Sequence, residues 1–163
     1  DALAEGAAPQ AEQMFAALAA EVPDRVEFAA GLARARVALG DLDGARAALA
    51  ALPADARHAT LAQARAALAL AEQATPVADL AGLAAKVAAN PDDHALRIEL
   101  AGGLMARGDR DGAAEALLES IRRDATWNDG AARARLLTLF EAVGLTDPWV
   151  VATRRKLSTL LFA

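Results

Sequence analysis

The sequence GDLDGA at residues 40–45 recurs as GDRDGA at residues 108–113. The first glycine of each copy suits a helix end that needs a left-handed residue, and the aspartate behind it suits the cap of the next helix. The second glycine and the alanine that follows it are small residues, which suit a place where two antiparallel helices touch. We therefore predict that each copy forms a tight turn between two paired helices.

The spacing of the two copies indicates a repeat. They lie 68 residues apart, which is twice the tetratricopeptide repeat length of about 34 residues. The repeats that align best begin at Val26, Thr60, His94 and Asn128. Small residues then share the eighth position, and Pro91 falls near the end of a repeat, where proline is usual. The middle repeat is degenerate, because its turn reads Ala74-Thr75-Pro76. A helical bundle in which one hexapeptide recurs by chance is the alternative.

The composition favours an all-α fold built from such hairpins. Of the 163 residues 55% are apolar, alanine is the most frequent, and tyrosine is absent. About nine helices are expected, joined by short segments with Pro, Gly, Asp or Asn. Their expected ranges are residues 9–21, 24–39, 42–52, 55–73, 77–89, 92–107, 110–123, 127–143 and 148–162. Hairpins of this kind stack into a curved, tetratricopeptide-like solenoid with a concave groove.

No residue pattern indicates an enzyme. Asp92 and Asp93 follow Pro91 and are expected to cap a helix, and the charged residues at 119–124 are typical of a solvated helix face. Gly102-Gly103 lies inside a predicted helix, so close packing or a kink explains it better than a phosphate-binding loop. We therefore expect no catalytic residue.

The sequence also argues against metals, cofactors, nucleic acid and membranes. Cysteine is absent, and His58 and His94 each lack a nearby ligand partner. The net charge of −5 does not provide the basic face that nucleic acid requires. No apolar run is long enough to span a membrane and no signal peptide is visible, so a cytoplasmic location is expected. The chain begins at Asp1 rather than Met, as expected of a part of a longer protein.

The last predicted helix has two faces. Pro148 and Trp149 open it after a break at residues 144–147. One face is expected to pack on the preceding hairpin and carries Val150, Leu157, Leu160 and Leu161. A second face stays uncovered and carries Val151, Arg155, Ser158 and Phe162. An uncovered apolar and basic face is suited to a partner's groove. The alternative is that Phe162 folds under the end of the stack.

Several short motifs in the last third of the chain point to a family. They are RRD at residues 122–124, WNDG at 127–130, Arg133 with the helix at 136–144, RRKL at 154–157 and LLF at 160–162. In these motifs the segment 121–162 resembles the C-terminal part of the bacterial chaperedoxins, and a weaker similarity extends back to residue 32. Chaperedoxins join a thioredoxin domain to a tetratricopeptide domain. The resemblance implies that this chain is the second part and that a thioredoxin domain lies upstream.

The resemblance also implies a chaperone function. Chaperedoxins act as holdases under oxidative stress and pass unfolding clients to a GroEL-type chaperonin and to the Hsp70 system. Their C-terminal helix docks on the chaperonin, which carries over here to residues 149–162. The matching positions are Arg154, Arg155, Leu157, Leu160, Leu161 and Phe162. The transfer is strongest for Arg155 and Phe162, because the leucines also lie on the packing face.

Two hypotheses of function follow. The first is a protein-binding domain that holds unfolded client proteins and docks on a chaperonin through its C-terminal helix. The second is a repeat scaffold that assembles a fixed protein complex and has no chaperone activity. In either case residues 1–163 are expected to form one tetratricopeptide-like domain. It would comprise an N-terminal helix and linker at 1–25, repeats at 26–147 and the C-terminal helix at 148–163.

Overall fold

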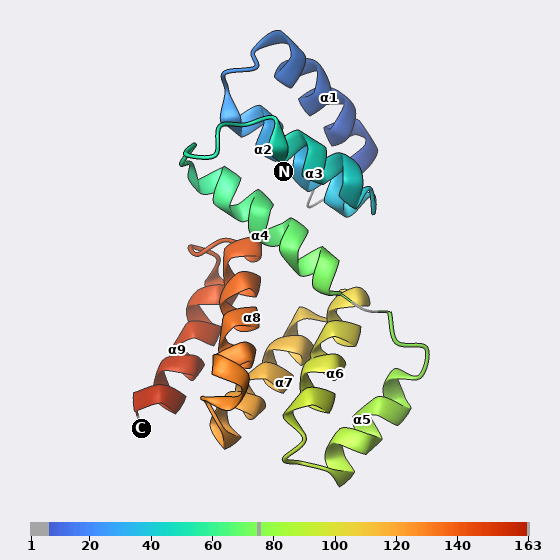
Figure 1. Ribbon diagram of the computed structural model, residues 1–163, viewed down its shortest axis with the longest axis vertical. Coiled ribbons are helices and arrows are strands. Elements are labelled where there is room, and N and C mark those ends of the chain that lie inside the picture. The colour runs from blue at the N-terminus through green and yellow to red at the C-terminus, as the bar shows by residue number, and fades with distance from the viewer. Residues whose placement is uncertain (1–6, 75, 163) are drawn as a thin grey trace. The chain divides into compact units, whose positions relative to one another are not determined.

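The computed structural model describes residues 7–74 and 76–162, and within these ranges the ordered elements are all helices, without a strand (Figure 1). The helices found there are α1 (Ala8–Glu21), α2 (Val26–Ala38), α3 (Leu42–Ala50), α4 (Ala59–Gln73), α5 (Leu80–Ala89), α6 (His94–Ala106), α7 (Arg110–Arg123), α8 (Trp127–Val143) and α9 (Pro148–Phe162). The predicted all-α class is thereby confirmed for the described residues. Residues 1–6 and 163 of the predicted terminal segments, and Thr75 in the predicted degenerate turn, lie outside them.

Contacts between residues divide the chain into two compact units. The first comprises Asp1–Glu72 with Glu141–Val143, and the second comprises Gln73–Phe140 with Gly144–Ala163. The prediction that residues 1–163 act as one domain stays a prediction.

Small residues bring the helices of the first unit close together. α1 packs against α2, and α2 packs against α3. One buried cluster draws on α2, α3 and α4, and its members are Ala30, Ala33, Ala45, Leu49, Leu61, Ala64 and Leu68. On another side of α2, a Cβ added at Gly31 would lie only 2.6 Å from the ring of Phe15. The missing side chain at Gly31 therefore allows α1 to approach α2.

The second unit repeats this kind of packing with larger side chains. α5 packs on α6, α6 on α7, and α7 on α9. Its largest fully buried apolar side chains lie on α8 and α9 and are Leu136, Leu139, Phe140 and Val150. A Cβ added at Gly103 in α6 would lie 2.8 Å from Leu80 Cδ1. The close packing predicted for the glycine pair in α6 is thereby confirmed at Gly103.

Both copies of the hexapeptide form the predicted turn. Gly40 and Gly108 have φ angles of +79° and +77°, in the left-handed region that glycine enters without strain. Asp41 Oδ1 accepts a hydrogen bond from the backbone N–H of Gly44 (2.9 Å), and the second copy makes the same bond at 2.8 Å. Each aspartate therefore caps the helix that follows it.

The second glycine of the hexapeptide has a different role from the predicted one. A Cβ added at Gly44 would lie 1.9 Å from Asp41 Oδ2, so the capping carboxylate occupies the space beside the glycine. The alanine behind it is buried in both copies, as Ala45 and Ala113. The glycine makes room for the cap, and the alanine packs in the core.

The middle repeat contains the same cap in a shifted position. Asp79 Oδ1 accepts a hydrogen bond from the N–H of Gly82 (2.8 Å) and begins α5. Asp79 lies 38 residues after Asp41, rather than the repeat length of about 34. Alignment at a constant spacing therefore missed it.

Two helices begin later than predicted. α4 begins at Ala59 rather than at residue 55, because the ring Nδ1 of His58 accepts the N–H of Thr60 (3.3 Å) and caps the start of the helix. α5 begins at Leu80 rather than at residue 77, because Asp79 caps it there. The other helix ends agree with the prediction within about two residues, the usual uncertainty of such boundaries.

Helix α8 begins with a left-handed turn that was not predicted. Asn128, Asp129 and Gly130 have φ angles of +47°, +56° and +76°. Short polar side chains and glycine tolerate this region better than other residues do. Just before the turn, Trp127 stacks on His94 of α6, with 5.4 Å between the ring centres. The turn thus joins this stacked pair to the rest of α8.

Candidate protein-binding surface on helix α9

Trp149 fixes the start of α9 within the second unit. Its indole Nε1 donates a hydrogen bond to Asp111 Oδ1 (2.5 Å), and the guanidinium of Arg110 lies 4.8 Å from the centre of the ring. The rings of Phe140 and Trp149 meet edge to face, with 6.3 Å between their centres. These contacts tie α9 to α7 and α8, so the remainder of α9 has a defined orientation toward them.

One face of α9 is buried, in agreement with the helical wheel. Val150 and Leu157 are buried, and Thr153 is buried between them. The Thr153 hydroxyl donates to the carbonyl of Trp149 (2.8 Å), which satisfies it without a partner from another helix. This face therefore holds α9 in place.

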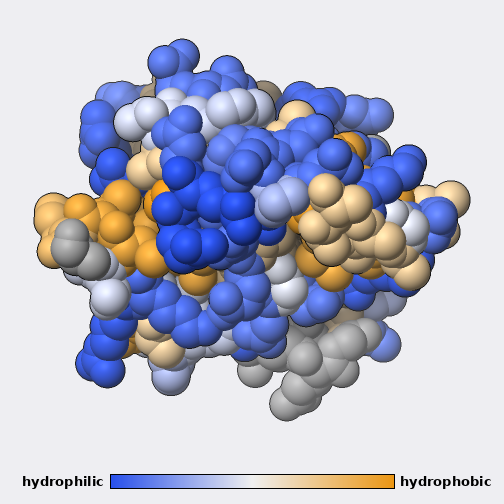
Figure 2. Space-filling view, turned by 90° about the horizontal axis from the view of Figure 1, so that it is seen from below, coloured by the Kyte–Doolittle hydropathy of each residue, from blue (hydrophilic) through white to orange (hydrophobic). Residues whose placement is uncertain are grey.

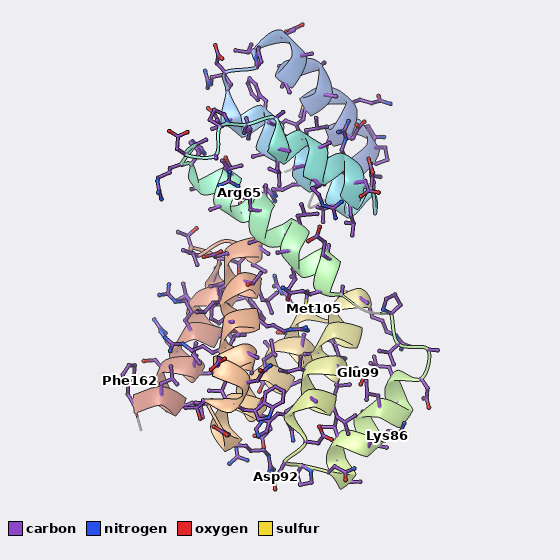
Figure 3. The ribbon with its side chains drawn as sticks, in the orientation of Figure 1. Arg65, Lys86, Asp92, Glu99, Met105 and Phe162 are labelled. Carbon is purple, nitrogen blue, oxygen red and sulfur yellow. The ribbon has the colours of Figure 1, made fainter. Side chains whose placement is uncertain are left out.

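The opposite face of α9 is open to solvent. Phe162 is 85% exposed, more than any other large hydrophobic residue in the described part of the chain, and Val151 is 38% exposed. Arg155 and Ser158 are exposed between them. We call these four residues the α9 surface. Phe162 projects from the far end of α9 in Figure 3, and apolar surface gathers at that end beside strongly hydrophilic surface in Figure 2.

The other residues assigned from the resemblance divide between the two faces. Arg154 is exposed, Leu160 and Leu161 are half-buried, and Leu157 is buried. Leu157 therefore supports the helix from inside, and the two half-buried leucines lie at the edge of the open face. A shallow hollow is lined by Arg155, Ser158, Thr159 and Phe162.

The basic charge of α9 is only partly neutralised. The helix carries Arg154, Arg155 and Lys156 and no acidic residue. Lys156 pairs with Glu115 of α7. The side chains of Arg154 and Arg155 make no hydrogen bond or ion pair with any described residue. In a chain with a net charge of −5, these two arginines form a local basic area.

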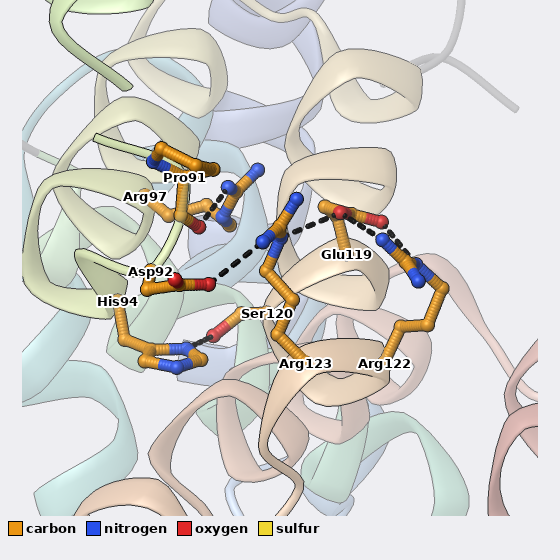
Figure 4. Close-up of polar contacts among 8 residues, drawn as sticks. All are labelled: Pro91, Asp92, His94, Arg97, Glu119, Ser120, Arg122 and Arg123. Atoms are coloured by element: carbon orange, nitrogen blue, oxygen red, sulfur yellow. Dashed lines mark hydrogen bonds and ion pairs between the residues drawn. The ribbon is translucent and has the colours of Figure 1, made fainter. Parts of the chain in front are cut away.

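A second group of polar residues lies between α6 and α7 (Figure 4). His94 Nδ1 and Ser120 Oγ are 2.8 Å apart, and both side chains are buried. Because the two side chains contact each other and join α6 to α7, this pair stabilises the helix hairpin. Asp93 caps α6 as predicted, by accepting the N–H of Leu96 (3.0 Å).

Asp92 forms an ion pair instead of the predicted cap. It lies 2.7 Å from Nη1 of Arg123, and Glu119 is 2.7 Å from Nε of the same arginine. Glu119 also meets Arg122 at 2.6 Å. The hydrogen bond from Arg122 and then that from Arg123 lower the pKa of Glu119 to about 2, although burial opposes the change. The predicted solvated face is exposed at Arg122, Arg123 and Asp124. Its charges also form an ion-pair network that joins α7 to the turn before α6.

Metal-binding groups and membrane-spanning helices are absent from the described ranges. Within residues 7–74 and 76–162, no three His, Cys, Asp or Glu side chains are grouped so as to hold a metal ion. No helix of that part is both long and apolar enough to cross a bilayer.

Comparison with known protein families gives two matches. Tetratricopeptide repeat models match residues 73–162 and, separately, residues 2–71. The first match covers more than half of the chain. No curated protein matches the chain. The matches agree with the capped hairpins described above, and they concern the repeat rather than any particular partner.

Proposed function

Because the chain belongs to the tetratricopeptide repeat family, we propose that it is the protein-binding domain of a chaperone and that it docks on a chaperonin through α9. Tetratricopeptide domains are typically protein-interaction modules without catalytic activity. The proposal takes the α9 surface as the contact. It is supported by the exposure of that surface and by the resemblance of residues 121–162 to the chaperedoxins.

The exposure of Phe162 is the observation that carries the proposal. With 85% of the residue in water, the ring forgoes most of the roughly 1.5–3 kcal/mol that its burial would contribute. A groove that takes up the ring recovers this free energy on binding. Val151 lies on the same face near the start of α9, and Phe162 lies at its end. The contact therefore has the form of an amphipathic helix in a groove.

The charge of α9 defines the chemistry of the partner. Arg154 and Arg155 have no acidic partner among the described residues. We infer that the chaperonin has a groove with an apolar floor, which takes up Phe162, and with acidic residues along its rim. Charges at a rim accelerate association more than they increase affinity. The half-buried Leu160 and Leu161 extend the apolar edge of the contact.

We also propose that the domain holds unfolded client proteins in the cytoplasm and passes them to the chaperonin and the Hsp70 system. Exposed Met14, Val22 and Leu39 in the first unit offer scattered apolar contacts for a non-native chain. The proposal requires no cofactor, nucleic acid or membrane.

Docking is tested by capture of a purified chaperonin on the intact chain and on two variants. Phe162→Ala removes the exposed ring, and Arg155→Glu reverses the nearby charge. We expect Phe162→Ala to weaken binding about tenfold or more, because truncation of a central aromatic anchor typically costs about 2 kcal/mol. Arg155→Glu should mainly lower the association rate constant.

Leu145→Ala and Arg107→Glu are the matched controls for these variants. Leu145 is an exposed apolar residue outside α9, and the side chain of Arg107 is exposed without a partner in the described part of the chain. Both controls should bind like the wild type. Circular dichroism establishes that each variant is folded. Equal capture of the wild type and of folded Phe162→Ala would reject the docking proposal.

Client holding is measured separately, by light scattering from an aggregating protein with and without this domain. We expect the domain to suppress aggregation and the Phe162→Ala variant to retain that effect. Unchanged scattering would reject client holding while leaving the docking proposal intact. Tight binding to one folded partner, without preference for unfolded chains, would favour the scaffold function instead.

A further inference from the structure

The ion-pair network between α6 and α7 contains more positive than negative charge (Figure 4). Arg97 of α6 lies near Arg122 and Arg123 of α7. The carboxylates whose negative charges raise its pKa belong to Glu119 and Asp92. Both carboxylates are already engaged, Asp92 by Arg123 and Glu119 by Arg122 and Arg123. Three guanidinium groups therefore share two carboxylates, which leaves an excess of one positive charge.

Of these three guanidinium groups, that of Arg97 has no carboxylate partner among the described residues. The residue is only 8% exposed, and its Nη2 donates to the carbonyl of Pro91 (2.6 Å). Its Nε is the one buried side-chain nitrogen or oxygen in residues 7–74 and 76–162 that has no hydrogen-bond partner. A buried donor without an acceptor reduces the free energy of unfolding, and the penalty is larger on a charged group. Arg97 is thus prepared for an acceptor that the chain itself does not provide.

Arg97 and Arg123 point toward one another in Figure 4. Arg123 uses Nε for Glu119 and Nη1 for Asp92, so its Nη2 has no partner among the described residues. Burial lowers the pKa of Arg97; Glu119 opposes this change, whereas the positive charges of Arg123 and Arg122 add to it. An anion held between the two guanidinium groups would relieve this repulsion and accept their remaining N–H groups.

We propose that Arg97 and Arg123 bind a carboxylate of a protein partner, from an aspartate or glutamate side chain. Guanidinium groups bind carboxylates through short, charge-assisted hydrogen bonds. One negative charge balances the excess positive charge, whereas a phosphate dianion would meet stronger repulsion from Asp92 and Glu119. The site shares no residue with the α9 surface, so it does not depend on docking to a chaperonin.

The test is a titration of ¹⁵N-labelled protein, followed through the Nε–Hε resonance of Arg97. The probes are an end-blocked Gly-Glu-Gly peptide, the matching Gly-Gln-Gly peptide, sodium acetate and sodium phosphate, with sodium chloride at equal ionic strength as reference. We expect a saturable shift with the glutamate peptide and with acetate. The glutamine peptide and chloride should cause no saturable shift.

Arg97→Met and Arg107→Met separate a specific site from general attraction of anions. Binding to each variant is followed by the Nε–Hε resonance of Arg123. Arg97→Met should weaken binding of the glutamate peptide about tenfold or more, because it removes charge-assisted hydrogen bonds. Arg107→Met removes an exposed arginine that has no partner among the described residues and should bind like the wild type. If Arg97→Met does not fold, the wild-type titration decides alone. Equal responses to the two peptides overturn the proposal, and tighter binding of phosphate than of acetate overturns the assignment to a carboxylate.

Discussion

The missing side chain at Gly31 decides how closely α1 approaches α2, because the ring of Phe15 fills the space that a Cβ would occupy. Overpacking in Gly31→Ala should cost about 1–3 kcal/mol, while alanine in a helix interior brings a gain of about 1 kcal/mol. We therefore predict that the variant lowers the free energy of unfolding by up to about 2 kcal/mol. Urea denaturation followed by circular dichroism measures the difference.

A second variant tests the cause of this loss. In a Phe15→Leu background the smaller side chain leaves room for the new methyl group, so Gly31→Ala should cost less there. The difference between the two backgrounds is the coupling of a double-mutant cycle. The same cost in both backgrounds would contradict a clash between residues 15 and 31.

Glu119 makes the stability of the second unit depend on pH. Its pKa is about 2 in the folded chain, below the ordinary value of 4.5. The contribution of Glu119 to the free energy of unfolding is therefore complete above pH 4.5 and is lost as the pH falls toward 2. We predict that Glu119→Gln lowers the free energy of unfolding at pH 7 by about 1 kcal/mol, less than full linkage would give, because the side chain is 30% exposed and screened.

Urea titrations at a series of pH values test this prediction. Glu119→Gln should lose less stability between pH 4.5 and 2 than the wild type does. Glu99→Gln is the control, because Glu99 is exposed and makes no ion pair with a described residue. Identical pH profiles for the wild type and Glu119→Gln would disprove the role of Glu119.

Among single residues, local roles were easier to predict than pairings across helices. Asp41 and Asp93 were recognised as caps, because a cap depends on the next few residues. The ion pair of Asp92 with Arg123 joins residues 31 apart in sequence, so it depends on how α6 and α7 pack. The unpartnered Nε of Arg97 depends on the same packing and had no signal in the sequence.

At the scale of elements, Trp149 determines how α9 is held on its neighbours. We predict that Trp149→Phe lowers the free energy of unfolding by about 1 kcal/mol, because Asp111 loses its hydrogen bond. Trp149→Ala should cost about 2–3 kcal/mol, because the contacts with Phe140 and Arg110 are lost as well. Amide hydrogen exchange should accelerate in α9 more than in α6.

Val151→Ala is the control for this prediction, since Val151 lies on the open face of the same helix. Its effect should stay within about 0.5 kcal/mol, as for most surface substitutions. If α9 exchanges at the wild-type rate in Trp149→Ala, the tryptophan does not fix the helix.

Helices were predicted well from sequence where periodicity and caps coincide. The two faces of α9 followed from its wheel, because an α-helix advances about 100° per residue. The cap at Asp79 was missed, because an insertion shifts it from the regular repeat. The left-handed turn at residues 128–130 was missed as well, since its sequence is equally compatible with an ordinary helix start.

At the scale of the whole molecule, charge distribution predicts how binding responds to salt. The chain carries a net charge of −5, whereas α9 carries only basic charges. With an acidic rim on the groove of the chaperonin, the rate constant for association of the two proteins should fall as ionic strength rises from about 0.01 M to 0.15 M. Over this range the Debye length shortens from about 30 to 8 Å, so the attraction between the charges is screened. Stopped-flow fluorescence measures this slope.

Arg155→Glu should show a smaller decrease with salt than the wild type does, and Arg107→Glu should show the wild-type decrease. A slope that is the same for both variants would mean that the charge of α9 does not steer association. The half-buried leucines would then account for binding through apolar contact alone.

The all-α tetratricopeptide class was predictable because it depends on composition and on a recurring turn, which are properties of the chain as a whole. The α9 surface was partly predictable, because burial of Val150 and Leu157 follows from periodicity. The partner of that surface is a property of two molecules, and only the resemblance to a family pointed to it.

The packing order of the second unit has a consequence for the time course of folding. α5 contacts α6, and α6 contacts α7, so these contacts join segments that are adjacent in the chain. Contacts between neighbouring segments form quickly, because little chain entropy is lost in closing them. The contact between α7 and α9 joins helices that α8 separates in the sequence. It can therefore form only after α9 has been synthesised. The chain therefore acquires its supporting hairpin first and its candidate docking helix later, so a nascent chain presents Phe162 only once the support for α9 exists.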